Sequence, residues 1–361
     1  MKLLRKLLAT SAALMLAVGA QAQDKVGTPA APDKNFHIYL AFGQSNMEGY
    51  PIRDAATWAD LQKDVDPRFQ LLAAVDFAAN SRAGERKAGQ WYVAVPPLCR
   101  ADSGLAPPDF FGRTLVANLP KEIRVGVVTV AVAGCKIETF DKKGYEAEMA
   151  TWRQGDFKIN IAKQYGGNPY QRLVDLGKEA QKVGVIKGIL LHQGESNNND
   201  REWPNKVKAI YEDLLKDLGL KADDVPLLAG EVLARDQRGA TASMNAIIDE
   251  LPKTIPTAHV ISAEGCSTQD ATNLHFDPAG YRELGTRFAV TMLSLLGHKI
   301  ERAPVFAPPR PAPAPGAGGR GGRGGRGRGA GAPVAPAPAQ DGGAAPAAPA
   351  AAPAAPAAPA L

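Results

Sequence analysis

Short apolar runs alternate with amphipathic stretches between about residues 36 and 296. Five runs have the length and residue types of buried strands, and they span residues 36–42, 123–132, 185–191, 226–233 and 259–263. Four stretches have apolar residues at helical spacing, and they span residues 170–183, 204–218, 241–251 and 278–296. Strands that alternate with helices indicate right-handed βαβ units. The pattern therefore predicts an α/β fold with a mainly parallel sheet covered on both faces.

The segment 51–120 departs from this alternation. It lacks a sustained period of either kind, and we expect a long loop-rich insertion that contains a helix near residues 109–117.

The first 22 residues have the pattern of a signal peptide. A cationic head with Lys2, Arg5 and Lys6 precedes an apolar run at residues 7–20, and Ala20-Gln21-Ala22 has the form of a cleavage site. The apolar run is shorter than the roughly 20 residues that span a bilayer, and no later run is long and apolar enough to do so. We expect cleavage after Ala22 and a secreted or periplasmic protein without a transmembrane segment.

Residues 303–361 consist almost entirely of Pro, Ala, Gly and Arg, and we expect them to be disordered because such side chains cannot build a core. The Arg-Gly run in this tail suits a solvated linker or a contact with an anionic cell-surface polymer. We expect the remaining residues, 23–302, to form one large domain.

The net charge of +5 lies mostly outside that domain. It divides into +3 for the first 22 residues, +4 for the tail and −2 for the remainder. A near-neutral domain gives no electrostatic reason to expect a nucleic-acid partner.

Cys99, Cys135 and Cys266 are the three cysteines, so at most one internal disulfide can form in this exported chain. Their spacing is not that of zinc ligands, and we expect neither a metal nor another cofactor.

Polar residues follow several of the predicted strands. The first strand runs into GQSNMEG at residues 43–49, the third into HQGESN at 192–197, and the fifth into a loop that ends at His275. Ligands bind at the carboxyl ends of the strands in open α/β sheets, so these segments should meet at one edge.

Ser45 and His275 are the candidate reactive pair at this edge. Ser45 follows a strand and could cap a helix, but the flanking glycines let the backbone approach a ligand closely. GQSNMEG is not the G-x-S-x-G elbow, because Met47 replaces its second glycine. A serine hydroxyl needs a neighbouring base to become nucleophilic, and His275 can supply it.

GQSNMEG, HQGESN and NLHFDPAGYRELGTRFA together resemble SGNH-type esterases, namely carbohydrate esterase family 6 and the related sialate O-acetylesterase-like domains. The resemblance implies a flavodoxin-like three-layer α/β/α sandwich with Ser45 as nucleophile and His275 as base. It also implies an oxyanion hole formed by the backbone N–H groups of Ser45 and Gly134 and by the Gln193 amide, with no cofactor.

The sequence does not determine which carboxylate orients His275 and so completes a catalytic triad with Ser45. Many relatives carry Asp three residues before the histidine, and Thr272 stands there in this chain. Glu195 is the preferred substitute and Asp270 the alternative. Glu195 could instead be a structural carboxylate that ties loops together, for example through Asn46.

The resemblance implies that the substrate is an acetylated carbohydrate, with acetylated xylan or a related plant polysaccharide as the first choice. The alternatives are a sialate O-acetylesterase and a non-catalytic carbohydrate-binding domain with a degraded triad. Four aromatic residues are candidates either for stacking against sugars or for packing: Trp58, Trp91, Tyr92 and Trp152.

Overall fold

The computed structural model describes residues 32–49, 61–63, 65–298 and 300. The strands are β1 (Phe36–Gly43), β2 (Phe69–Leu72), β3 (Trp91–Val93), β4 (Arg124–Ala131), β5 (Val185–His192), β6 (Leu227–Gly230) and β7 (Ala258–Ile261). The helices are α1 (Ser45–Glu48), α3 (Pro107–Asn118), α4 (Tyr145–Met149), α5 (Phe157–Gln164), α6 (Pro169–Gln181), α7 (Trp203–Leu218), α8 (Asn245–Ile248), α9 (Leu251–Thr254) and α10 (Pro278–Leu295). The expected signal peptide (1–22) and tail (303–361) lie outside the described residues.

The strands form one seven-stranded sheet in the order β3-β2-β4-β1-β5-β6-β7. All neighbouring pairs are parallel except β2 with β3. Without β2 and β3, the strands stand in the chain order 2-1-3-4-5, which is the flavodoxin-like order. The predicted α/β class and its mainly parallel sheet are confirmed.

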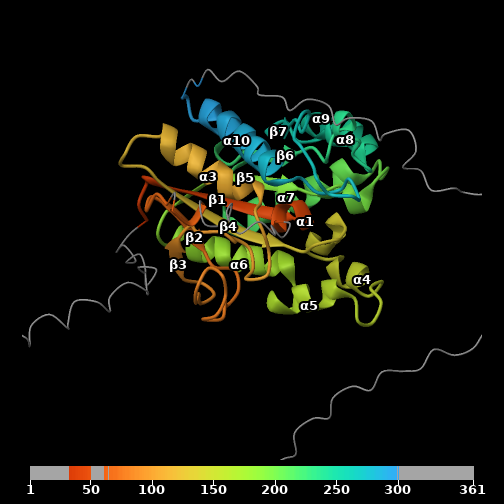
Figure 1. The fold of residues 1–361 in the computed structure, drawn as a ribbon, viewed down its shortest axis with the longest axis horizontal. Helices are drawn as coiled ribbons and strands as arrows, with labels where there is room; N and C mark the ends of the chain where they lie inside the picture. The colour runs from red at the N-terminus through yellow and green to blue at the C-terminus, as the bar shows by residue number, and fades with distance from the viewer. Residues whose placement is uncertain (1–31, 50–60, 64, 299, 301–361) are drawn as a thin grey trace, which may run out of the picture. The chain divides into compact units, whose positions relative to one another are not determined.

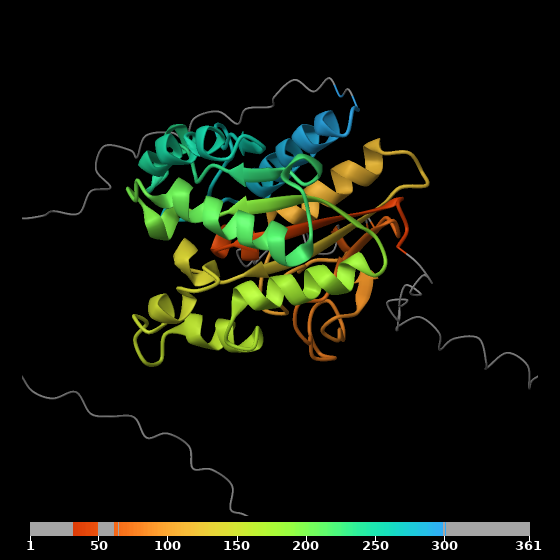
Figure 2. The same ribbon diagram turned by 180° about the vertical axis from the view of Figure 1, so that it is seen from behind.

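Side chains alternate between the two faces of the sheet, and each face is covered by helices. On β1, Ile38, Leu40 and Phe42 belong to one buried cluster, whereas Tyr39 and Ala41 belong to the other. Helices α6 and α7 pack on the first face, and α3 and α10 pack on the second. Figures 1 and 2 show α3 and α10 together on one side of the sheet and α6 on the other, as a three-layer sandwich requires.

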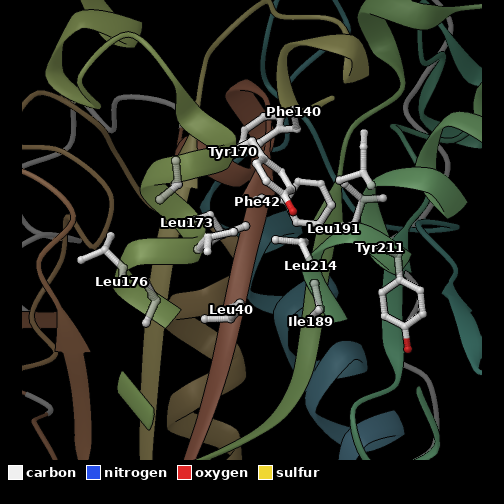
Figure 3. Packing of buried hydrophobic residues seen from close by; sticks show 14 of the residues in the cluster. Leu40, Phe42, Phe140, Tyr170, Leu173, Leu176, Ile189, Leu191, Tyr211 and Leu214 are labelled. Carbon is white, nitrogen blue, oxygen red and sulfur yellow. The ribbon is translucent and has the colours of Figure 1, made fainter. Parts of the chain in front are cut away.

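The core on the α6 and α7 face is built from large aliphatic and aromatic side chains. Leu40, Ile189 and Leu191 project from the two central strands toward Leu173 of α6 and Leu214 of α7 (Figure 3). Central strands buried on both faces read as continuous apolar runs, and the sequence predicts β1, β4 and β5 well for that reason.

Two regions of the structure differ from the prediction. The single helix expected at 241–251 is divided into a 3-10 turn (Ala242–Met244), α8 and α9, because Pro252 lacks an N–H and begins a new helix. The insertion at 51–120 contains the expected helix α3, but it also holds β2 and β3, which extend the sheet at its edge. Residues 50–60 of this insertion lie outside the described part.

The three cysteines are buried and unpaired, so the disulfide that the sequence permits is not formed. Burial raises the pKa of Cys99 and of Cys266 to about 12. Among the described residues, no helix is both long enough and apolar enough to cross a membrane.

Helices α3 and α10 approach closely at Gly285. A Cβ at this position would lie 2.4 Å from the carbonyl oxygen of Pro107 and 2.9 Å from Cβ of Phe110. Gly285→Ala should therefore lower the free energy of unfolding, because an overlap that costs about 2 kcal/mol or more exceeds the helix-propensity gain of about 1 kcal/mol. Denaturant unfolding measures the change.

The control is Ser294→Ala, which alters an exposed residue of the same helix and should change stability by less than about 0.5 kcal/mol. Equal stability of Gly285→Ala and the wild type would contradict this account of the helix contact.

Candidate active site

The ends of β1 and β5 meet through Gly43. Its φ is +151°, and a Cβ there would lie 2.0 Å from the carbonyl oxygen of His192. The same carbonyl accepts a hydrogen bond from the N–H of Gln44 at 3.1 Å. Because glycine allows this approach, Ser45 begins α1 directly beside the HQGESN segment.

Ser45, His275 and Asp270 form a hydrogen-bonded series. The Ser45 Oγ lies 3.0 Å from Nε2 of His275, and Nδ1 of the same ring lies 2.9 Å from Oδ2 of Asp270. With the Nδ1 proton donated to the carboxylate, Nε2 is free to accept the proton of the serine hydroxyl. The predicted nucleophile and base are therefore brought together, although 230 residues separate them in the chain.

Asp270 reaches His275 through a turn. The N–H of Asn273 donates to the Asp270 carbonyl at 3.0 Å, and Asn273 has a φ of +55°. The Asp270 carboxylate also accepts hydrogen bonds from the Thr272 hydroxyl and from the N–H of Leu274. Burial pushes the pKa of Asp270 upward, but these hydrogen bonds and the one from His275 outweigh it and hold the pKa well below its usual range.

Glu195, the preferred acid in the sequence, occupies another position. Its Oε1 accepts from Nδ2 of Asn46 at 2.6 Å and lies 3.8 Å from Nδ1 of His192. Glu195 therefore links its loop to Asn46, which is the structural role that the sequence offered as the alternative to catalysis. The preference for Glu195 as the partner of His275 is thus corrected in favour of Asp270, because the 270–273 turn compensates for Thr272.

Asn46 is fully buried and connects three segments. Its Nδ2 donates to Glu195 and, at 2.9 Å, to the carbonyl of Leu274. Its Oδ1 accepts from the Tyr281 hydroxyl at 2.9 Å and from the N–H of Phe276 at 3.4 Å. Because Leu274 and Phe276 flank the histidine, the residue next to the serine holds the histidine loop in place.

Two residues that line the cleft beside the serine hydroxyl have backbone amides without a hydrogen-bond partner among the described residues. The N–H groups of Ser45 and Gly134 make no hydrogen bond to any residue that the structure describes. Gly134 has a φ of +70°, which favours glycine. Both residues line the same cleft as His275. Amides in this position are suited to stabilise a developing oxyanion.

Gln193 does not join these amides, and its expected place in the oxyanion hole is corrected. The side chain is fully buried, and its Nε2 donates to Gln44 at 3.0 Å, to the Cys135 carbonyl at 3.3 Å and to Asn197 at 2.7 Å. Its Oε1 accepts from Nε1 of Trp203. Gln193 therefore fixes the loop before Ser45 and has no proton left for a substrate.

The cleft beside Ser45 has a volume of about 630 Å³, within the range of about 300–1,000 Å³ that is usual for ligand pockets. One wall contains the buried ion pair of Arg100 with Glu48, and Arg100 also pairs with Asp102 at 2.7 Å. The second carboxylate oxygen of Glu48 accepts from the N–H of Ala133 at 2.8 Å. Four residues of α5 also line this cleft, and the pattern of the sequence did not predict this helix.

The four aromatic candidates for sugar contact lie elsewhere or are undescribed. Trp91 packs on Phe36 with a centroid distance of 4.8 Å, and Tyr92 and Trp152 are buried. Trp58 lies outside the described residues. Phe157 of α5, which was not singled out in the sequence, lines the cleft instead.

Solved structures similar in fold include a protein from Arabidopsis thaliana, with a TM-score of 0.52 and 19% identity over 72% of this chain and 98% of that one. A carbohydrate acetylesterase from Xanthomonas citri has a TM-score of 0.51 and 18% identity over 73% of this chain and 57% of that one. NanS has a TM-score of 0.51 and 17% identity over 74% of this chain and 99% of that one. These similarities support the fold.

The family comparison extends to function. Residues 35–294 match the family described as carbohydrate esterase, sialic acid-specific acetylesterase. The match covers more than half of the chain and includes Ser45, Asp270 and His275. The chain belongs to this carbohydrate esterase family, and it is a carboxylic ester hydrolase of the class that removes O-acetyl groups from carbohydrate.

Proposed function

We propose that this protein is an exported serine esterase that removes O-acetyl groups from a neutral polysaccharide or oligosaccharide, with acetylated xylan as the leading substrate. The observation that carries the catalytic part is the Ser45–His275–Asp270 series beside two unpartnered amides. The proposed export rests on the residue pattern of residues 1–22.

In the first half of the reaction, Nε2 of His275 takes the proton of Ser45 as Oγ attacks the acetyl carbonyl carbon. The amides of Ser45 and Gly134 donate to the negative oxygen of the tetrahedral intermediate. The intermediate collapses to an acetyl-serine, and the sugar alkoxide leaves with the proton that His275 returns.

In the second half, His275 takes a proton from water as its oxygen attacks the acetyl-serine. Collapse of this intermediate releases acetate and returns the proton to Ser45. Asp270 holds the imidazole in the required tautomer and stabilises the imidazolium in both halves. Because hydrogen bonds hold its pKa well below its usual range, Asp270 is ionised at neutral pH.

The charges around the cleft support a neutral sugar. Arg100 is the one arginine or lysine among the described lining residues, and its two terminal nitrogens are taken by Glu48 and Asp102. Asp102 is largely exposed, with 72% of its side-chain surface accessible. A sugar carboxylate would therefore meet a paired cation and an exposed negative charge.

A sialate O-acetylesterase is the second candidate, and the description of the matched family favours it. The non-catalytic alternative loses its main argument, since Asp270 supplies the carboxylate that Thr272 cannot.

Replacement of the nucleophile tests the mechanism. Ser45→Ala should lower kcat for acetate release by at least about 10⁴-fold, because the variant lacks the hydroxyl that forms the acetyl intermediate beside His275. A fluorophosphonate probe should label the wild type at Ser45, as read by mass spectrometry, and should not label the variant. Full activity of Ser45→Ala on an acetylated sugar would refute the assignment, and Ser294→Ala serves as the unaffected control.

A pair of carboxamide variants distinguishes the two carboxylates. Asp270→Asn should lower kcat by about 10²- to 10⁴-fold, because the amide no longer stabilises the imidazolium or fixes its tautomer. Glu195→Gln keeps an oxygen that accepts from Asn46, and kcat should fall less than about tenfold. Both are measured at neutral pH, with unfolding curves to confirm that each variant is folded. A larger loss of kcat in Glu195→Gln than in Asp270→Asn would assign the acidic role to Glu195 instead.

Acetate release from a substrate panel tests the choice of sugar. We expect the highest kcat/KM on acetylated xylo-oligosaccharides and a lower value on O-acetylated sialic acid, because the described cleft has no unpaired cation for a carboxylate. Acetylated pectin, which carries its own carboxylates, should also be a poorer substrate. Preference for the sialate ester would establish the second candidate.

A further inference from the structure

Phe157 is an exposed aromatic side chain in the wall of the catalytic cleft. Its exposed fraction is 59%, the highest among the large hydrophobic residues that the structure describes as exposed. A single exposed apolar residue is ordinary on a protein surface. The position of Phe157 is informative because it lines the same cleft as Ser45 and His275.

The Phe157 ring lies next to the proposed oxyanion site. Its Cζ is 3.3 Å from the point that a Cβ of Gly134 would occupy. Glycine at 134 therefore leaves room for this ring as well as exposing its own amide. A carbonyl oxygen bound to that amide would place the rest of the ester within contact distance of Phe157.

The neighbouring side chains on α5 share this face. Asn160, Ile161 and Gln164 also line the cleft, and their spacing from Phe157 places all four on one side of the helix. Asn160 and Gln164 are exposed, and neither amide has a hydrogen-bond partner among the described residues. The face thus combines one flat apolar ring with free donors and acceptors.

Helix α5 is anchored by core packing and by a capped N-terminus. Ile161 and Ala162 are buried in the core, and Asp156 caps the helix by accepting from the N–H of Lys158 at 3.0 Å. Lys158 in turn pairs with Asp156 at 3.4 Å and lies over the Trp152 ring. A binding face on an anchored helix needs little reorganisation when a ligand arrives.

We propose that Phe157 is the platform for the sugar ring that carries the acetyl group, with Asn160 and Gln164 binding its hydroxyls. This inference rests on the proposed function. The C–H groups of a sugar face carry partial positive charge, which the negative face of an aromatic ring attracts. The cleft is far larger than an acetyl group, and the ring is open to solvent, so Phe157 belongs to the alcohol side of the ester and not to the acyl side.

The test compares two acetate esters in Phe157→Ala. For an acetylated xylo-oligosaccharide, KM should rise about tenfold with kcat changed less than about threefold, because the platform binds the ring and leaves the chemistry intact. For ethyl acetate, which has the same acetyl group and no ring, kcat/KM should stay within about twofold of the wild type. Phe157→Tyr should keep the KM for the sugar ester close to the wild-type value, because it retains an aromatic ring at this position.

The control is Leu295→Ala, which removes another exposed apolar side chain, 43% accessible and located on α10. It should leave both esters unaffected. An unchanged KM for the sugar ester in Phe157→Ala would overturn the proposal, as would equal losses on both esters, which would place Phe157 on the acyl side. Ser45→Ala separates the two hypotheses. Activity in that variant refutes the proposed function, whereas inactivity combined with a normal Phe157→Ala refutes only the platform.

Discussion

The site depends on the hydrogen bonds of one buried amide. Asn46 directly follows the proposed nucleophile, and its side chain holds the backbone on both sides of His275. A buried amide that fills both its donor and acceptor positions allows one arrangement of its neighbours, since any displacement leaves a polar atom unsatisfied in a dry environment. The distance between serine and histidine is therefore set by the residue beside the serine. Glu195 and Tyr281 complete this network from two other elements.

The topology of the sheet brings the segments of the site together. Its strand order reverses at β1, so the segments after β1, β4 and β5 emerge side by side at the carboxyl edge. Gly43 lets the end of β1 approach the end of β5, and Gly134, in the loop after β4, leaves room for the Phe157 side chain of α5. The buried Gln193 then fixes the loop that precedes Ser45. The meeting of these segments at one edge is thus a consequence of topology, and Gly43, Asn46 and Gln193 fix their final positions.

The sequence predicts the parts of this arrangement that depend on pattern. Apolar runs predict β1, β4 and β5, because a strand buried on both faces consists mostly of apolar residues, and the motifs predict Ser45 and His275 as the reactive pair. The choice between Glu195 and Asp270 depends on a tight turn with Asn273 at positive φ, which spacing alone does not reveal. The direction of the Gln193 amide is equally invisible, since a glutamine in a loop can face either the cleft or the core. Phe157 belongs to no pattern, because an isolated aromatic on a short helix has the same sequence signal whether it packs or binds.

The buried cysteines bear on where this domain can fold. The thiolate is the form that reacts in disulfide exchange and alkylation, and burial both hides the three sulfur atoms and disfavours their ionisation. No step toward the native state of the described domain requires an oxidant. The structure that these residues describe therefore needs no disulfide, in the reducing interior of a cell or in the oxidising space outside it.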